Sequence, residues 1–186
     1  MRKIVAVVGD ADITGDQKKY DIAYSIGKLL VENGYRVQSG GLEGVMHAAF
    51  CGAKAAENAK DGDTLALVPS FDRKAASPYA DIVVATGLDL FRNVLVANAD
   101  AVIAVGGGAG TLSEIANAWA MKRLVIAIDS VDGWSKKMAN VRPDSRIRYP
   151  ELADDRVFGA STAEEAIRII NEKIDAYTSV YTGIRK

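Results

Sequence analysis

The stretch of sequence that decides the fold runs from Ala101 to Met121 and reads AVIAVGGGAGTLSEIANAWAM. Its first five residues are apolar, which is typical of a strand buried on both faces. Four glycines follow within five positions, and from Thr111 onward the spacing of apolar residues predicts a helix. Glycines let a ligand come close to the backbone, and the first N–H groups of a helix have no partner within it. This order of elements therefore predicts a site for a phosphorylated ligand.

Apolar runs typical of buried strands alternate with helical patterns along the whole chain. The sequence predicts strands at residues 4–8, 35–38, 64–68, 82–85, 101–105, 124–128 and 156–158, and helices at 17–33, 45–58, 88–98, 111–121 and 161–177. Such alternation is typical of a mainly parallel α/β sheet with helices on both faces, which makes three layers, α/β/α. The length of 186 residues fits a single domain over residues 1–186.

Two stretches, residues 70–80 and residues 129–155, have no clear period. The second stretch is long for a plain connection between two elements of a compact domain. It carries Trp134 and several charged residues, so a lid, a subunit contact and an irregular excursion are all open for it.

The composition excludes several classes of protein. The net charge is −1, from 23 basic and 24 acidic residues, so no electrostatic feature favours nucleic acid or an anionic membrane as a partner. We find no apolar run long enough for a signal peptide or a membrane span, and we expect a cytoplasmic protein. With Cys51 as the single cysteine and His47 as the single histidine, neither an internal disulfide nor a dedicated metal site is expected.

Glycines cluster directly after three of the predicted strands. The carboxyl ends of parallel strands lie on one edge of a sheet, and ligands bind at that edge where the strand order reverses. We therefore expect these glycines to form one ligand site, with the loops at 40–44 and 106–111 binding phosphate; plain turn chemistry is the alternative. The clustered glycines are Gly9, Gly15, Gly40, Gly41, Gly44, Gly106, Gly107, Gly108 and Gly110.

Two familiar phosphate motifs are absent. No Lys-Ser or Lys-Thr pair follows a glycine loop, which excludes a P-loop nucleotidase. The first strand is not followed by G-x-G-x-x-G, and no acidic residue stands where dinucleotide-binding proteins hold the ribose. A nicotinamide-dependent dehydrogenase is therefore not expected.

Thr111 and Glu114 have the spacing of a capping box, in which both side chains satisfy free N–H groups at a helix start. Residues 161–164 have the same spacing without a glycine loop, and there we expect capping alone. At 111–114 the preceding glycines favour a ligand-binding or catalytic role for Glu114. Asp10 and Asp12 fit hydrogen bonds to a base or sugar as well as they fit turn capping, and from composition alone Arg92 is a solvated helix arginine.

Two blocks of the chain resemble a known superfamily. Residues 40–46, GGLEGVM, are similar to its first glycine loop, and Arg92-Asn93 together with residues 99–101 and 106–114, GGGAGTLSE, resemble its second block. The superfamily contains the Lonely-guy (LOG) phosphoribohydrolases and the molybdenum-cofactor carrier proteins. The resemblance implies a Rossmann-like, doubly wound fold, a 5′-phosphorylated ligand, and a homodimer or larger homo-oligomer. It places Met46 and Thr111 with the ligand-binding glycines, and it matches Arg92 and Glu114 to the catalytic arginine and glutamate of the LOG enzymes.

The second block also departs from the LOG pattern. Val105 stands where the LOG enzymes have proline, and Asn93 stands where they have lysine. A Gly-Gly-Gly start and an Arg-Asn pair are closer to the carrier branch, so these departures bear on catalysis more than on binding. The superfamily has often been labelled lysine decarboxylase, but the sequence has no recognisable lysine site for pyridoxal phosphate.

Two functions follow from these observations. In the first, the protein binds a nucleotide-like 5′-phosphate and hydrolyses the N-glycosidic bond of a nucleoside 5′-monophosphate, with Arg92 holding the ligand and Glu114 stabilising the cationic transition state. In the second, it is a non-catalytic carrier of the molybdenum cofactor or a related phosphorylated pterin, which would be cargo rather than a required cofactor. Both need a small phosphorylated molecule, and neither needs nucleic acid or a membrane. The apolar segments 22–30 and 94–98 add support for a homo-oligomer.

Overall fold

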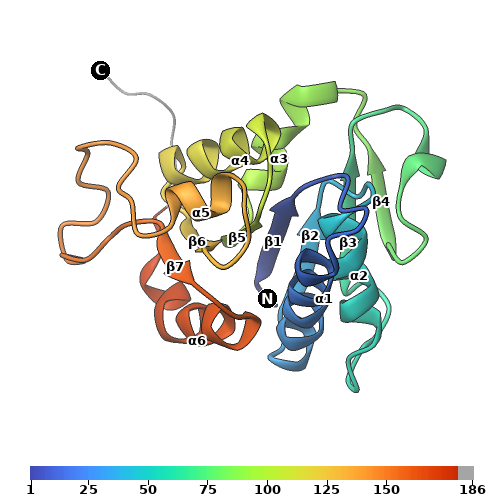
Figure 1. The fold of residues 1–186 in the computed structure, drawn as a ribbon, viewed down its shortest axis with the longest axis horizontal. Coiled ribbons are helices and arrows are strands. Elements are labelled where there is room, and N and C mark those ends of the chain that lie inside the picture. Colours follow the sequence, from blue (N-terminus) through green and yellow to red (C-terminus); the bar gives the residue numbers. More distant parts are fainter. Residues whose placement is uncertain (180–186) are drawn as a thin grey trace.

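One parallel sheet of seven strands forms the centre of the molecule (Figure 1). The computed structural model describes residues 1–179. The strands lie in the order β4-β3-β2-β1-β5-β6-β7, and every neighbouring pair is parallel. Their bounds are β1 (Ile4–Gly9), β2 (Arg36–Ser39), β3 (Thr64–Val68), β4 (Ile82–Ala85), β5 (Ala101–Val105), β6 (Leu124–Ile128) and β7 (Phe158–Ala160).

Helices cover both faces of this sheet, as Figure 1 shows. On one face lie α1 (Gln17–Glu32), α2 (Val45–Lys54) and α6 (Ala163–Lys173). On the other lie α3 (Asn93–Ala97), α4 (Ala109–Ala120) and α5 (Trp134–Met138). Short 3₁₀ turns occupy Arg73–Ala75, Asp89–Arg92 and Ile174–Ala176. The predicted Rossmann-like, three-layer α/β/α fold is confirmed. The predicted domain range also includes residues 180–186, which lie outside the described part of the chain.

The central strands are apolar throughout because both of their faces are buried. In β1, Val5 and Val7 pack under α1 and α2, whereas Ala6 and Val8 pack toward α3 and α4. These four residues are at most 1% exposed. Burial of apolar surface is the main term that stabilises such a core, and it contributes about 25 cal/mol for each Å² removed from water.

The order of the strands reverses between β1 and β5. The chain adds β2, β3 and β4 outward on one side, then returns to place β5 against the free edge of β1, with Gly9 opposite Val105. The loops that follow β1 and β5 therefore leave the sheet side by side and diverge to opposite faces. A gap at this reversal is where parallel α/β sheets bind their ligands.

Several element boundaries differ from the prediction. The 88–98 segment is a 3₁₀ turn followed by the five-residue α3, and β7 lies two residues later than expected. α2 ends at Lys54, and α6 ends at Lys173 before a 3₁₀ turn. One apolar stripe of the predicted 161–177 helix is buried: Ala163, Ile167 and Ile170 of α6 and Ile174 of the 3₁₀ turn are all at most 5% exposed.

The long segment 129–155 is fastened to the core by a buried arginine. Arg148 is 5% exposed, and its Nε and Nη2 donate to the two carboxylate oxygens of Asp155 at 2.9 and 2.6 Å. Its Nη1 donates to the carbonyl groups of Trp119 and Arg123, and its guanidinium lies 3.5 Å from the centre of the Trp119 ring. Of the three readings open for this segment, the structure supports an irregular excursion with a fixed base. No helix within residues 1–179 is long and apolar enough to cross a membrane.

Candidate functional site

A cavity of about 230 Å³, called the first cavity below, opens at the reversal between β1 and β5. It is bounded by the loop after β1, the first turn of α2, the 3₁₀ turn before α3 and the start of α4. Its lining residues are Gly9, Asp10, Ala11, Leu42, Met46, Leu90, Arg92, Asn93, Gly108, Gly110, Thr111 and Glu114. The structure thus brings together seven of the predicted site residues: Gly9, Met46, Arg92, Gly108, Gly110, Thr111 and Glu114.

Arg92 and Glu114 form a buried ion pair in the wall of the first cavity. Arg92 Nη1 donates to Glu114 Oε1 at 3.0 Å, and the two side chains are 9% and 7% exposed. Arg92 Nε is buried and has no partner within residues 1–179. The expectation of a solvated helix arginine is therefore wrong, because Arg92 ends the 3₁₀ turn on the side that faces α4.

Burial also changes the acidity of Glu114. Removal from water raises the pKa of its carboxyl group to about 7, although the adjacent Arg92 guanidinium acts in the opposite direction. The group therefore exchanges its proton near neutral pH. Perturbed carboxyl groups in cavities are typical of functional sites.

The capping box predicted at 111–114 does not form. α4 begins at Ala109, two residues earlier than predicted, because Gly106 and Gly107 turn the chain with φ of +65° and +93°. Its N-cap is Gly108, which has no side chain to cap the helix, and Glu114 faces Arg92 instead. At α6 capping does occur, one residue later than predicted, where Thr162 Oγ1 accepts from the Glu165 N–H at 3.2 Å.

The first turn of α4 presents unpaired backbone donors to the first cavity. The N–H groups of residues 108–111 have no hydrogen-bond acceptor in the described part of the chain. A Cβ atom at Gly108 would meet no other atom within 4 Å, and one at Gly110 would meet only Asn93 Nδ2 at 3.8 Å. The fold itself therefore does not require glycine at these two positions, and the open space is on the ligand side.

The other predicted glycines serve packing. A Cβ atom at Gly40 would lie 2.4 Å from Arg92 Nη2, and one at Gly9 would lie 2.2 Å from the carbonyl oxygen of Val105. Gly41 and Gly44 combine positive φ with close neighbours, namely Ala66 Cβ at 2.5 Å and the Asp10 carbonyl oxygen at 2.2 Å. Gly40, Gly41, Gly44, Gly106 and Gly107 lie outside the lining of the first cavity. These five glycines pack behind the residues that line the first cavity. Their direct contact with phosphate stays a prediction, and the set of lining residues does not support it.

Two features that sequence reasoning did not identify hold the 106–108 loop in place. Asp10 Oδ2 accepts from the Gly107 N–H at 2.8 Å and pairs with Lys19 Nζ at 2.8 Å. Asp10 therefore braces the backbone, whereas Asp12 caps its own turn by accepting from the Thr14 N–H at 2.9 Å. For Asp10 the structure supports the structural use; for Asp12 it shows the turn cap, and a hydrogen bond to a base or sugar stays a prediction.

The second brace comes from the start of α5, within the 129–155 excursion. The N–H groups of Trp134 and Ser135 donate to the carbonyl groups of Gly107 and Gly106, both at 2.9 Å. Ser135 Oγ accepts from the Gly106 N–H at 2.8 Å and donates to the Ile128 carbonyl group at 2.6 Å. The aperiodic sequence around Trp134 carries no signal of this contact.

Asn93, Leu42, Leu90 and Ala11 also line the first cavity and were not predicted site residues. Asn93 Nδ2 donates to Ser113 Oγ at 2.9 Å, which ties α3 to the first turn of α4. Its position next to Arg92 in the second block was the signal that could have identified it. Leu42 lies within the predicted 40–44 loop, although it was not singled out there. Ala11 and Leu90 lie in turns with no periodic pattern, so nothing in the sequence marks these two.

Comparison with known proteins identifies the family. Residues 2–166 match the SLOG cluster4 family, and the chain belongs to it. Among solved structures, the protein TM1055 is 31% identical with a TM-score of 0.77, over 91% of this chain and 99% of that one. The molybdenum cofactor binding protein of Rippkaea orientalis is 32% identical with a TM-score of 0.74, over 94% and 98%.

The molybdenum cofactor carrier protein of Chlamydomonas reinhardtii is also similar. It is 26% identical with a TM-score of 0.73, over 94% of this chain and 99% of that protein. The resemblance to the superfamily of LOG proteins and molybdenum-cofactor carriers is thereby confirmed.

Proposed function

We propose that this SLOG cluster4 protein binds a small phosphorylated molecule of the nucleotide or pterin class in the first cavity and acts as a binding or carrier protein. One observation carries the proposal. Gly108 and Gly110 leave space over the unpaired N–H groups of α4, and the buried Arg92, with an unpartnered Nε, lies in the same wall. An anion placed there would receive backbone hydrogen bonds and the positive end of the helix dipole.

The charge arrangement supports a phosphate monoester over a carboxylate. A guanidinium group and several backbone N–H groups converge on one small space, and a phosphate offers three oxygens to accept from both. Hydrogen bonds to a charged group contribute about 1.5–3 kcal/mol each. Three of them contribute about 4.5–9 kcal/mol before the entropy of association is subtracted, so micromolar affinity also needs contacts from the rest of the ligand.

The cargo that the relatives suggest is the molybdenum cofactor or a related phosphorylated pterin. Two of the similar solved structures are named as proteins that bind or carry this cofactor. The carrier branch of the superfamily is also favoured by the Gly-Gly-Gly start of the second loop at residues 106–108 and by the pair Arg92-Asn93, where the LOG pattern has lysine after the arginine. In this proposal the cofactor is cargo, held for transfer and not used by the protein.

Hydrolysis of an N-glycosidic bond is the second candidate, and Glu114 is the observation that favours it. Its carboxyl group lines the first cavity beside the proposed phosphate position and exchanges its proton near neutral pH. As a carboxylate it would stabilise the oxocarbenium-like charge that develops on the ribose as the base leaves and water attacks, and Arg92 would hold the phosphate or the ribose in place.

A homodimer is proposed as the assembly, supported by an exposed apolar patch beside the first cavity. The patch consists of Leu88, Leu90, Phe91, Val94 and Leu95, which are 44–82% exposed. Of the two apolar segments that favoured an oligomer, only 94–98 contributes, because Ile26 and Leu30 of the other are fully buried under α2 and α6. Sedimentation at twice the chain mass of 19.8 kDa is expected, and a clean monomer at micromolar concentration would contradict it.

One experiment tests binding and separates the two functions. The protein is titrated with AMP, GMP and ribose 5-phosphate by calorimetry, and the same samples are analysed by chromatography for free base. Binding without release of base supports the carrier, and release of base by wild type that is lost in Glu114→Gln supports the hydrolase. Absence of binding for every phosphate monoester refutes the proposal.

A further inference from the structure

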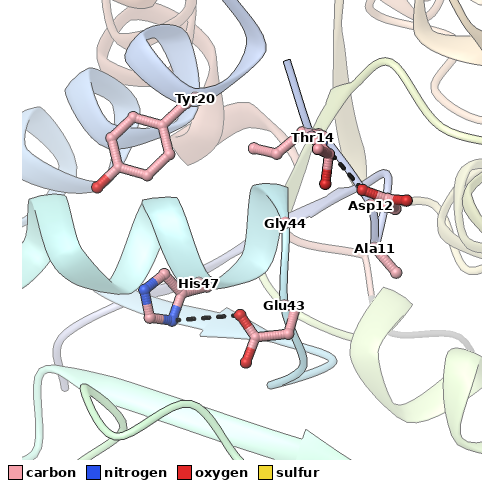
Figure 2. Close-up of a pocket in the computed structure, with 8 residues that line it drawn as sticks. Ala11, Asp12, Thr14, Tyr20, Glu43, Gly44 and His47 are labelled. Atoms are coloured by element: carbon pink, nitrogen blue, oxygen red, sulfur yellow. Dashed lines mark hydrogen bonds and ion pairs between the residues drawn. The ribbon is translucent and has the colours of Figure 1, made fainter. Parts of the chain in front are cut away.

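A second cavity, of about 550 Å³, lies on the other side of the loop that follows β1 (Figure 2). Its lining residues are Ala11, Asp12, Ile13, Thr14, Tyr20, Glu43, Gly44 and His47. Ala11 lines both cavities, so the two adjoin along this residue. The first turn of α2 and the residues before it serve both: Leu42 and Met46 line the first cavity, whereas Glu43 and His47 line the second.

The second cavity differs in charge from the first, because the lining of the first includes the Arg92 guanidinium group beside its carboxyl groups. The second cavity is lined by the carboxyl groups of Asp12 and Glu43, and neither lysine nor arginine is among its lining residues. The Thr14 N–H donates to Asp12 and holds the pKa of that carboxyl group below its usual value, so Asp12 is ionised at neutral pH. Glu43 is 78% exposed and faces the same space (Figure 2). This lining repels phosphate and accepts hydrogen bonds from N–H groups.

Aromatic side chains complete the wall, and their arrangement argues against a catalytic triad. His47 Nδ1 lies 3.1 Å from Ser77 Oγ and 3.9 Å from Glu43 Oε2, so serine and carboxylate face the same ring nitrogen. A triad needs them on opposite nitrogens. The ring is held instead by Ser77 and by an edge contact with Tyr79 at 5.3 Å between ring centres. Tyr20 is also among the lining residues, and aromatic rings suit contact with a heterocycle.

We infer that the second cavity holds the ring end of the ligand whose phosphate lies in the first cavity, and that this ring has a 2-amino-4-oxopyrimidine edge. Guanine and pterin share that edge, which places an NH₂ group beside a ring N–H. A carboxylate accepts from both donors at once. Adenine places a ring acceptor beside its amino group, so the carboxylates of Asp12 and Glu43 would face a lone pair. The inference rests on the proposed function, because it assigns the other end of the same ligand.

The test compares three monophosphates and one double variant. Wild type is titrated by calorimetry with GMP, AMP and ribose 5-phosphate, and then with a pterin that carries a phosphate monoester. The same titrations are run on the Asp12→Asn/Glu43→Gln double variant, which keeps the shape of both side chains and a good turn residue at position 12. Glu57→Gln, at an exposed carboxylate in the turn that follows α2, is the matched control.

We expect wild type to bind GMP roughly 5–150-fold more tightly than AMP, the discrimination of one well-placed bidentate pair. The double variant should lose this preference and bind ribose 5-phosphate as wild type does, and Glu57→Gln should change nothing. GMP and the phosphorylated pterin are compared in the same way. The one that binds more tightly, and whose binding weakens in the double variant, is the kind of ligand that the second cavity takes. AMP binding as tightly as GMP, or a preference that survives in the double variant, overturns the inference. If ribose 5-phosphate and every other monoester fail to bind, the proposed function fails instead.

Discussion

Replacing Gly108 with aspartate should make the protein more stable and abolish binding of a phosphate monoester. Gly108 is the N-cap of α4, its backbone is extended with φ −97° and ψ −151°, and a Cβ atom there meets nothing within 4 Å. Aspartate fits this conformation and is among the best N-cap residues. Its carboxylate would accept from the same N–H groups of residues 110 and 111 that we assign to the ligand.

The size of both effects follows from the structure. A better cap adds a few tenths of a kcal/mol over glycine, a charge at the positive end of the helix adds about 0.3–1 kcal/mol, and loss of glycine from the unfolded chain adds about 0.4–1 kcal/mol. The free energy of unfolding should therefore rise by about 1–2 kcal/mol, which is about 2–8 °C in Tm for a chain of this size. Losing two hydrogen bonds to phosphate should weaken binding by roughly 100-fold or more.

Thermal unfolding and calorimetry with ribose 5-phosphate measure the two effects on one sample. Gly108→Asn is the matched variant, because asparagine caps equally well but carries no charge. It therefore shows how much affinity is lost because the N–H groups are occupied and how much because a carboxylate repels the phosphate. The free energy of unfolding of Gly108→Asn should also rise, and its loss of affinity for ribose 5-phosphate should be smaller than that of Gly108→Asp. Unchanged affinity in a stabilised Gly108→Asp protein would refute the assignment of phosphate to α4. A fall in stability would refute the claim that these N–H groups are unpaired.

Three further predictions concern buried charges. Gly40→Ala should push the Arg92 guanidinium out of its position, because the new Cβ would lie 2.4 Å from Nη2, and we expect ribose 5-phosphate to bind at least roughly tenfold more weakly in a folded protein; unchanged binding in calorimetry would contradict this. The folded protein keeps the Glu114 proton up to a pH of about 7 and the unfolded chain releases it near 4.5, so wild type should lose up to about 3 kcal/mol of stability relative to Glu114→Gln as the pH rises through this window. The free energy of unfolding of both proteins is measured by urea denaturation at pH 5 and pH 8. If the difference between wild type and Glu114→Gln is the same at both pH values, burial does not raise the pKa of Glu114. Asp155→Asn should lower the free energy of unfolding by about 3–5 kcal/mol, because it leaves the Arg148 charge buried without its partner, and a Tm within 2 °C of wild type would show that the pair contributes little.

The fold could be predicted because its strands are buried on both faces. Continuous apolar runs such as Ala101–Val105 and Leu124–Ile128 are typical of strands buried on both faces of a sheet. The structure places both strands as predicted. Boundaries near Gly108 and after Lys54 were less predictable, since they depend on how loops from other parts of the chain pack. The start of α4, for example, is set by the turn that Gly106 and Gly107 make.

The candidate site was predictable where residue type alone points to chemistry. Arg92, Glu114 and the glycines of the 106–110 cluster were identified from spacing and resemblance, and the structure brings most of them to one cavity. What could not be predicted is which glycines serve the ligand and which serve packing. Gly40 and Gly108 look alike in the sequence, yet a Cβ atom would meet a guanidinium at one and open space at the other. That difference comes from contacts between segments some fifty residues apart, for which a single sequence has no signal.

The reversal between β1 and β5 has a mechanical consequence. Residues 1–87 and 88–179 form two lobes whose strands pair with each other only between β1 and β5. The lobes also touch where α1 contacts α6, where α4 contacts β1, and where Gln38 Nε2 donates to the Val96 carbonyl group at 2.9 Å. The first cavity takes Gly9 from one lobe and Arg92 and Glu114 from the other. A bound ligand would therefore contact both lobes, and at a free concentration of 100 times its Kd it would add about 2.7 kcal/mol to the free energy of unfolding. Loading would add ligand contacts across the β1–β5 seam to the strand pair, helix contacts and hydrogen bonds that already join the two lobes.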